Sequence, residues 1–185
     1  METFNIIGID PGLNMGVSVY NISLPDYNVN YITPLLYKID NYLEYGDSYY
    51  YNHMYARCNL IYNITNSLLI SYSPLAIAYE AAFMNSKYAT AVIQLTQYTN
   101  SIERAIRDYD PFIKVITYPP MLIKKLVGAG GQANKEDMLN NAKQIPLLNS
   151  KLPLDSLSEH EVDAASIAYV LYNDILSKPW MLYTL

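Results

Sequence analysis

The sequence predicts an α/β domain in which helices flank a mixed five-stranded sheet. Three short strand-like runs precede residue 40, before any helical pattern begins. Two further apolar runs then alternate with long helical patterns, an order typical of parallel strands joined by helices. The 185 residues are 51% apolar and 16% charged, which supplies a core and excludes a disordered chain. No repeat or linker divides the chain, so we expect one domain over residues 1–185.

Short apolar or alternating runs predict the strands. The Asn5–Asp10 run is stopped by Pro11–Gly12, as expected of a buried strand that ends in a turn. The next run alternates and suits a hairpin partner, and Pro34 marks the third as an edge strand or a bulge. The five predicted strands are residues 5–10, 17–22, 30–39, 75–79 and 112–117.

Helical spacing predicts the remaining elements. Leu60, Ile61, Ile64 and Leu68 recur at helical spacing within residues 49–72, and Ser73–Pro74 ends that helix. Residues 86–109 and 158–176 have the pattern of two further helices. The part between residues 120 and 157 looks helical, with a glycine-rich break at residues 128–131.

Charge and cysteine content exclude several classes of protein. The net charge of −5 argues against a general polyanion binder, although residues 104–143 carry seven Lys and Arg against four Asp and Glu. The single Cys58 excludes a disulfide scaffold and a cysteine-rich zinc site. The start of the chain lacks a secretory pattern, and the longest uncharged stretch, residues 59–79, is too polar to span a bilayer. We therefore expect a cytoplasmic protein with no membrane partner.

Two acidic residues end predicted strands. Asp10 and Glu80 lie at or just past the carboxyl ends of their strands, the edge at which α/β sheets form sites. Asp10 with Pro11–Gly12 also fits an ordinary turn, or the phosphate turn of an actin-like ATPase, but no second such turn follows. Glu80 ends a buried run, where a charge is costly without a partner, and a divalent metal ion would supply one.

A third acid, Asp163, lies at the start of the last predicted helix. His160 is three residues before it and shares its face, whereas Glu161, two residues before, points away. Glu159 is also on the Asp163 side and is a fallback ligand. A surface ion pair, or acids favoured by the helix dipole, would explain the same residues without a site. His53, with no partner in view, is expected at the surface.

The three acids come from separate segments and, with one imidazole and no set of cysteines, favour Mg²⁺ or Mn²⁺ over structural zinc. Two such ions close together hydrolyse phosphodiesters, because one activates the water and the other stabilises the leaving oxygen. Nearby cations would balance the charge of the transition state. The sequence therefore predicts a metal-dependent phosphodiesterase site.

Four segments in one order resemble the RuvC-type Holliday junction resolvases, from about residue 4 to residue 174. They are IIGIDPGLNMGVSVY, LAIAYEAAFMNS, the lysines around the glycine-rich turn GAGGQANK, and HEVDAASIAY. Lys124 and Lys135 match the two basic positions of the family. The turn is one residue longer than the usual Gly-x-Gly-x-Ala pattern, which leaves Lys125 as an alternative to Lys124.

The resemblance implies an RNase H-like fold and a Mg²⁺-dependent endonuclease, with two ions per site, for which Mn²⁺ can substitute. It implies a homodimer that nicks two opposing strands of a four-way junction symmetrically. By motif match the metal ligands are Asp10, Glu80, His160 and Asp163. Lys124 and Lys135 would contact phosphates or support the transition state, and Phe83 would stack on a base. Further candidates for DNA binding in the basic segment are Lys125, Arg104 and Arg107.

Other functions stay open at this stage. A relaxed branched-DNA or flap nuclease of the same family would use the same acids. An RNA nuclease of the same fold usually lacks the Phe–Met that follows Glu80 here. A non-catalytic DNA-binding module is disfavoured, because unpaired carboxylates beside phosphate weaken binding. The small size and divergent composition favour a phage or viral source, and hence the cytoplasm of a bacterial host.

Overall fold

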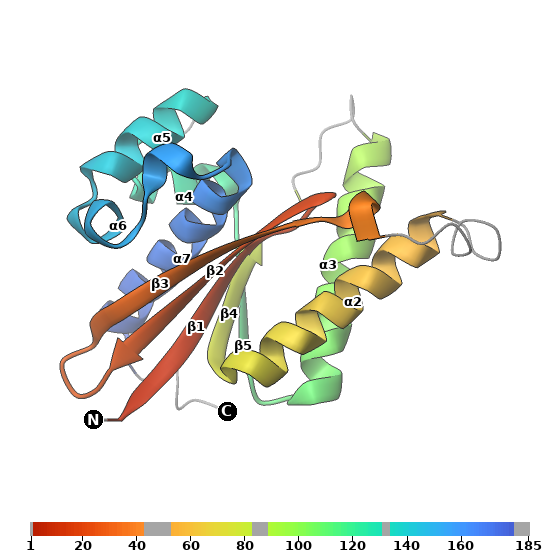
Figure 1. Cartoon of the computed structure of the whole chain (residues 1–185), viewed down its shortest axis with the longest axis horizontal. Coiled ribbons are helices and arrows are strands. Elements are labelled where there is room, and N and C mark those ends of the chain that lie inside the picture. The colour runs from red at the N-terminus through yellow and green to blue at the C-terminus, as the bar shows by residue number, and fades with distance from the viewer. Residues whose placement is uncertain (1, 43–52, 83–88, 131–133, 180–185) are drawn as a thin grey trace.

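A mixed five-stranded sheet with the order β3–β2–β1–β4–β5 forms the centre of the molecule. The computed structural model describes residues 2–42, 53–82, 89–130 and 134–179. β2 is antiparallel to β1 and β3, whereas β4 and β5 run parallel to β1. The strands are β1 (Thr3–Asp10), β2 (Asn14–Ser23), β3 (Asn28–Lys38), β4 (Pro74–Glu80) and β5 (Lys114–Tyr118). The predicted fold class is confirmed (Figure 1).

The strand predictions hold with shifts of at most a few residues at the ends. β3 lies at an edge of the sheet, which accommodates Pro34 in the way the sequence indicates. β5 begins at Lys114 rather than at Phe112. The reason is a turn in which the Asp110 side chain accepts a hydrogen bond from the Phe112 N–H at 2.9 Å.

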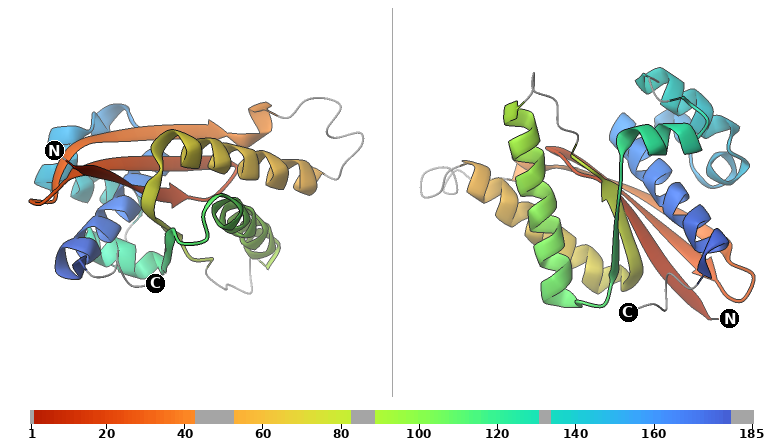
Figure 2. Two further views of the ribbon diagram at one scale, coloured as in Figure 1. Left: turned by 90° about the horizontal axis from the view of Figure 1, so that it is seen from below. Right: turned by 180° about the vertical axis from the view of Figure 1, so that it is seen from behind.

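Helices cover both faces of the sheet (Figures 1 and 2). α2 (His53–Tyr72) and α3 (Ala89–Tyr109) pack together on one face. The other face carries α4 (Pro120–Leu126), α5 (Lys135–Gln144), α6 (Pro146–Lys151) and α7 (Glu159–Ser177). Short 3₁₀ turns, Ile39–Tyr42 and Leu154–Ser156, follow β3 and precede α7. The predicted starts of the first two helices, residues 49–52 and 86–88, lie outside the described residues.

The sheet separates two apolar cores. Ile7, Ile9 and Ile77 face α2 and α3, whereas Ile6, Ala76 and Ala78 face α7. Because side chains alternate along a strand, the second set places Asp10 and Glu80 on the α7 face of the sheet. None of the helices in the described part of the chain is long and apolar enough to cross a membrane.

α7 lies unusually close to the sheet because two glycines leave room for its backbone. A Cβ added at Gly8 of β1 would lie 2.4 Å from the carbonyl oxygen of Ala164. A Cβ added at Gly16 of β2 would lie 2.0 Å from the carbonyl oxygen of His160. Gly16 is also the register partner of Asp10. These glycines therefore set the distance between the first turn of α7 and the carboxyl end of β1.

Candidate active site

Asp10 and His160 meet where β1 ends and α7 begins. The His160 Nδ1 lies 2.7 Å from the Asp10 Oδ2, and the two side chains are only 29% and 19% exposed. The pKa of His160 is raised, first by this hydrogen bond and then by the negative charge of Asp10, Glu159 and Asp163. The pair joins segments 150 residues apart in the sequence.

The start of α7 is fixed by a capping box. Ser158 accepts from the backbone N–H of Glu161, while the Glu161 carboxylate accepts from the Ser158 N–H at 2.9 Å. Glu161 is thereby turned back to the helix end, in agreement with its expected direction away from Asp163. The box leaves Glu159, His160 and Asp163 of α7 to face the site.

Glu80 and Asp163 complete a cluster of repelling carboxyls. The pKa of Glu80 is raised to about 7, chiefly because the group is buried and next because Asp10 and Asp163 repel its charged form. The pKa of Asp163 is raised to about 6, chiefly by burial and then by Asp10. Lys124 acts in the opposite direction on both groups. The carboxyls therefore face one another without enough positive charge to offset them.

The donor set of this cluster fits a hard divalent cation. Carboxylate oxygens and an imidazole are suitable ligands for Mg²⁺ or Mn²⁺, and a bound cation would relieve the repulsion that raises the two pKa values. Among the residues that the structure describes, no three His, Cys, Asp or Glu side chains are yet placed to hold one ion. Asp10 and His160 are bonded to each other instead, so metal binding requires side-chain rotation.

A cavity of about 330 Å³ brings the acids and the lysines together. Glu80 and Asp163 line it with Lys124 from the end of α4 and Lys135 from the start of α5. Lys125 is exposed and does not line this cavity, which favours Lys124 among the two sequence candidates. Gly128 and Gly130 have positive φ, as expected of the predicted glycine-rich break, whereas its last residue, Gly131, lies outside the described residues.

The two arginines lie away from this cavity. α3 packs with α2 on one face of the sheet, whereas α4, α5 and α7 lie on the other, so Arg104 and Arg107 lie across the sheet from this cavity. Each is paired on its own helix, Arg104 with Asp108 at 3.6 Å and Arg107 with Glu103 at 3.2 Å. The structure does not bring them to the acids, and their role in DNA binding stays a prediction.

Two further sequence candidates need separate comment. Phe83, predicted to stack on a base, lies outside the described residues. His53 is exposed at the start of α2, as expected.

Sequence reasoning missed two features of the site. Glu159, considered there only as a fallback ligand, forms an ion pair with Lys135 instead. Gly16 is required for the approach of α7, and its pairing opposite Asp10 in a hairpin is the signal that could have indicated this.

In the metal-free protein, the stability should fall as the pH rises from 5 to 8. Glu80 and Asp163 have raised pKa values, near 7 and 6, and the pKa of His160 is also raised, so the folded state binds more protons than the unfolded chain. The penalty for Glu80 begins near its ordinary pKa of 4.5, is complete above 7, and amounts to on the order of 3 kcal/mol. Thermal unfolding in EDTA across this range measures it. Glu80→Gln should flatten the profile; an unchanged slope would contradict the prediction.

A family model and several solved structures match this chain. The family model described as crossover junction endodeoxyribonuclease RuvC matches residues 6–170. No curated protein matches the chain. Among solved structures, Thermus thermophilus RuvC is similar with a TM-score of 0.63 and 19% identity, covering 94% of this chain and 97% of that one.

Two other solved structures share the fold. T. thermophilus RuvC in complex with Holliday junction substrate has a TM-score of 0.62 and 17% identity over 95% of this chain and 96% of that one. The yeast mitochondrial Holliday junction resolvase Ydc2 has a TM-score of 0.61 and 13% identity over 96% and 78%. At these identities the solved structures establish the shared fold alone. Because the family model covers most of the sequence, the chain belongs to the RuvC family of crossover junction endodeoxyribonucleases, which are Holliday junction resolvases.

Proposed function

We propose that this protein resolves four-way DNA junctions as a homodimer, by symmetric and Mg²⁺-dependent hydrolysis of one phosphodiester in each of two opposing strands. The observation that carries the proposal is the meeting of Asp10, Glu80, His160 and Asp163 beside a cavity that Lys124 and Lys135 also line. Nucleases of the RuvC family are metal-dependent, and a related enzyme has been solved with its junction substrate.

Each group in the cluster has a distinct chemical task in this proposal. Asp10, Glu80, His160 and Asp163 would hold two Mg²⁺ ions, with Mn²⁺ as a substitute. The bound ions supply Lewis acidity, which activates water and stabilises the leaving oxygen. Lys124 and Lys135 would bind the scissile phosphate and offset the negative charge that develops in the transition state. In the metal-free protein, the hydrogen bond between His160 and the Asp10 carboxylate keeps these two ligands side by side.

Homodimerisation matches the symmetry of the substrate. A four-way junction presents two equivalent strands, and a two-fold dimer presents two equivalent sites to them. One carboxylate cluster per chain therefore supports two coordinated cuts.

The direct test is cleavage of a labelled synthetic four-way junction with Mg²⁺, beside a flap, a Y-fork and a plain duplex. Paired, symmetric and ligatable nicks confined to the junction would support the proposal. Equal cutting of flaps and forks would replace it by a branched-DNA nuclease that uses the same acids. Tight junction binding with no cutting of any substrate would contradict a catalytic role for the acids.

The salt dependence of junction binding should identify the lysines that contact phosphate. Each phosphate contact adds about 0.9 to the slope of log affinity against log salt concentration, so Lys124→Ala should lower the slope by about 1. Fluorescence anisotropy over a salt series with Ca²⁺ in place of Mg²⁺ measures this slope without cleavage. Arg104→Ala tests the separate prediction for α3: an unchanged slope would remove Arg104 from the DNA contacts. An unchanged slope in Lys124→Ala would place the DNA elsewhere.

A further inference from the structure

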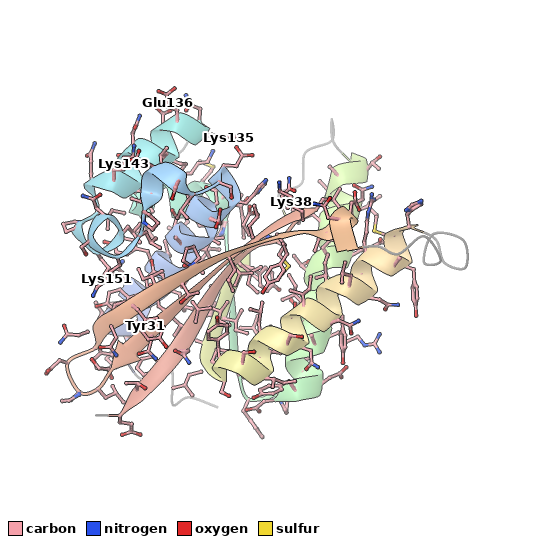
Figure 3. The ribbon with its side chains drawn as sticks, viewed as in Figure 1. Tyr31, Lys38, Lys135, Glu136, Lys143 and Lys151 are labelled. Carbon is pink, nitrogen blue, oxygen red and sulfur yellow. The ribbon has the colours of Figure 1, made fainter. Side chains whose placement is uncertain are left out.

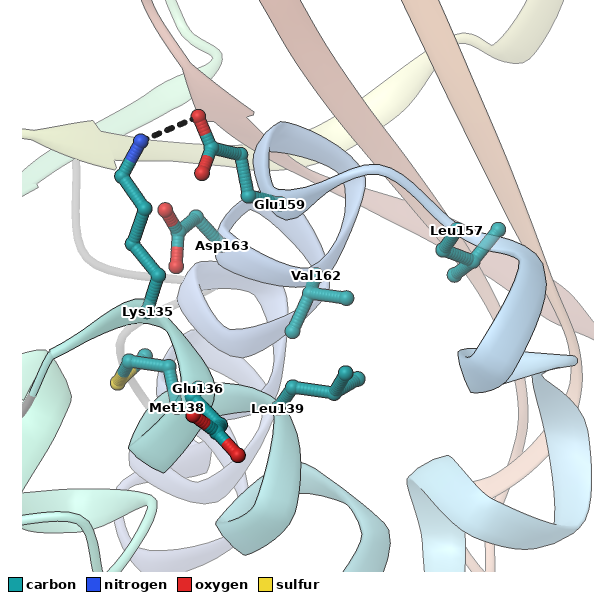
Figure 4. A pocket seen from close by; sticks show the side chains of 8 residues that line it. All are labelled: Lys135, Glu136, Met138, Leu139, Leu157, Glu159, Val162 and Asp163. Atoms are coloured by element: carbon teal, nitrogen blue, oxygen red, sulfur yellow. Dashed lines mark hydrogen bonds and ion pairs between the residues drawn. The ribbon is translucent and has the colours of Figure 1, made fainter.

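An ion pair connects the starts of α5 and α7 beside the acid cluster. The Lys135 Nζ lies 2.5 Å from the Glu159 Oε1 (Figure 4). The same carboxylate oxygen is 3.5 Å from the His160 Nε2. The pKa of Glu159 is lowered, first by its hydrogen bond with Lys135. A chain of contacts thus runs from Asp10 through His160 and Glu159 to Lys135.

Both partners of this ion pair occupy the first residue of a capped helix. Asn134 and Asp137 form a capping box at the start of α5, as Ser158 and Glu161 do in α7. The boxes fix the backbone from which each side chain extends. A lysine at a helix start is disfavoured by the helix dipole, whereas an acid there is favoured. Lys135 is therefore in an electrostatically poor position unless a counter-charge such as Glu159 accompanies it.

Lys135 lies between two cavities, and the ion pair with Glu159 fixes the position of its side chain there. Lys135 and Asp163 line both the 330 Å³ cavity that contains Glu80 and a second one of about 240 Å³. Glu159 lines only the second cavity. The carboxylate therefore holds the lysine at the boundary between the two. An ammonium group has three protons, so one can stay on Glu159 while the others are available to a phosphate.

We propose that Glu159 is a positioning residue that orients Lys135 toward the scissile phosphate. The inference rests on the proposed nuclease function and extends it to a residue outside the metal-ligand set. Without Glu159, the lysine would keep its charge but sample many rotamers, since a lysine side chain has four flexible torsions. Binding of the junction would then change little, while the fraction of complexes with Lys135 in the productive geometry would fall.

Glu136 provides a matched control. It is the next residue of α5, is also exposed, and lines the same smaller cavity as Glu159. Its carboxylate points away from Lys135 and Glu159 in Figure 4. Figure 3 shows Lys135 and Glu136 at the start of α5. Glu136→Gln therefore removes the same charge from the same region without touching the ion pair. Because an exposed pair contributes little to stability, neither variant should unfold the protein.

The kinetic test compares single-turnover cleavage and junction affinity. Glu159→Gln should lower the cleavage rate about fivefold with a Kd within twofold of wild type, and Glu136→Gln should alter neither. In a Lys135→Gln background, Glu159→Gln should cause no further loss, because its effect acts through the lysine. An undiminished rate, or an equal loss in the Lys135→Gln background, would overturn the proposal. If Glu159→Gln needs more Mg²⁺ for cleavage while the amine reactivity of Lys135 is unchanged, the proposal is also overturned and Glu159 is a metal ligand.

A second readout does not need nuclease activity. In the DNA-free protein, acylation of amines by an N-hydroxysuccinimide ester, followed by peptide mass spectrometry, reports how accessible each lysine is. Lys135 should react several-fold faster in Glu159→Gln than in wild type, with Lys125 as the internal reference. Equal Lys135 reactivity in the two proteins would overturn the inference, even if the junction is cleaved. Faster reactivity in a protein that cleaves no junction would instead contradict only the nuclease proposal.

Discussion

Asp163→Asn is expected to abolish cleavage of a four-way junction, by roughly a thousandfold or more, while junction binding is kept or becomes tighter. Asp163 is a mostly buried carboxyl beside Asp10 whose pKa is raised to about 6, so its charged form is held at a cost that a metal ion would remove. Asparagine has the same shape but lacks the charge, which weakens metal binding. The loss of one negative charge near the phosphates favours DNA binding.

The matched control for this substitution is Asp155→Asn. Asp155 lies in the short 3₁₀ turn that precedes α7, and its exposed side chain pairs with Lys143 at 2.5 Å. The same chemical change there should leave cleavage unaltered. Cleavage is measured with Mg²⁺ under single-turnover conditions, and binding with Ca²⁺ by fluorescence anisotropy. Wild-type cleavage by Asp163→Asn would remove Asp163 from the metal ligands, and equal losses in both variants would indicate a general effect on folding.

The two strand-end acids could be predicted from the sequence because strand topology alone brings them together. β1 and β4 are parallel neighbours, so residues that end them share one edge of the sheet. Asp10 and Glu80 are such residues. The three-residue spacing of His160 and Asp163 likewise fixes their common helix face. What the sequence pattern could not supply was the packing of α7 over this edge, which depends on the close approach at Gly8 and Gly16.

The basic segment at residues 104–143 is divided in the structure. Its charges are close in the sequence but lie on both faces of the sheet, because α3 packs on one face and α4 and α5 lie on the other. Lys124 lines the acid cavity, whereas Arg104 belongs to α3 on the other face of the sheet and pairs with Asp108. A net charge summed along the sequence therefore does not predict one basic surface.

Glu159 escaped prediction for a related reason. Its helical spacing correctly placed it on the Asp163 side of α7, which made it a fallback metal ligand. The contact that decides its role comes from Lys135, 24 residues earlier and on a different helix. No local period encodes such a contact, since it depends on how α5 packs against α7.

The second large effect is expected at Gly16, where Gly16→Ala should destabilise the protein by about 3 kcal/mol and reduce cleavage sharply. The added Cβ would lie 2.0 Å from the His160 carbonyl oxygen, so the backbone of α7 must move away and take His160 from Asp10. Gly12→Ala is the control for stability, because the nearest atom to its Cβ is 3.9 Å away. Urea unfolding and single-turnover cleavage measure the two effects. Normal stability with normal cleavage would show that α7 can move away from β2 at this contact without cost, which would contradict the prediction. Normal stability with lost cleavage would mean that α7 shifts without loss of packing, so that Gly16 acts on the geometry of the Asp10–His160 pair alone.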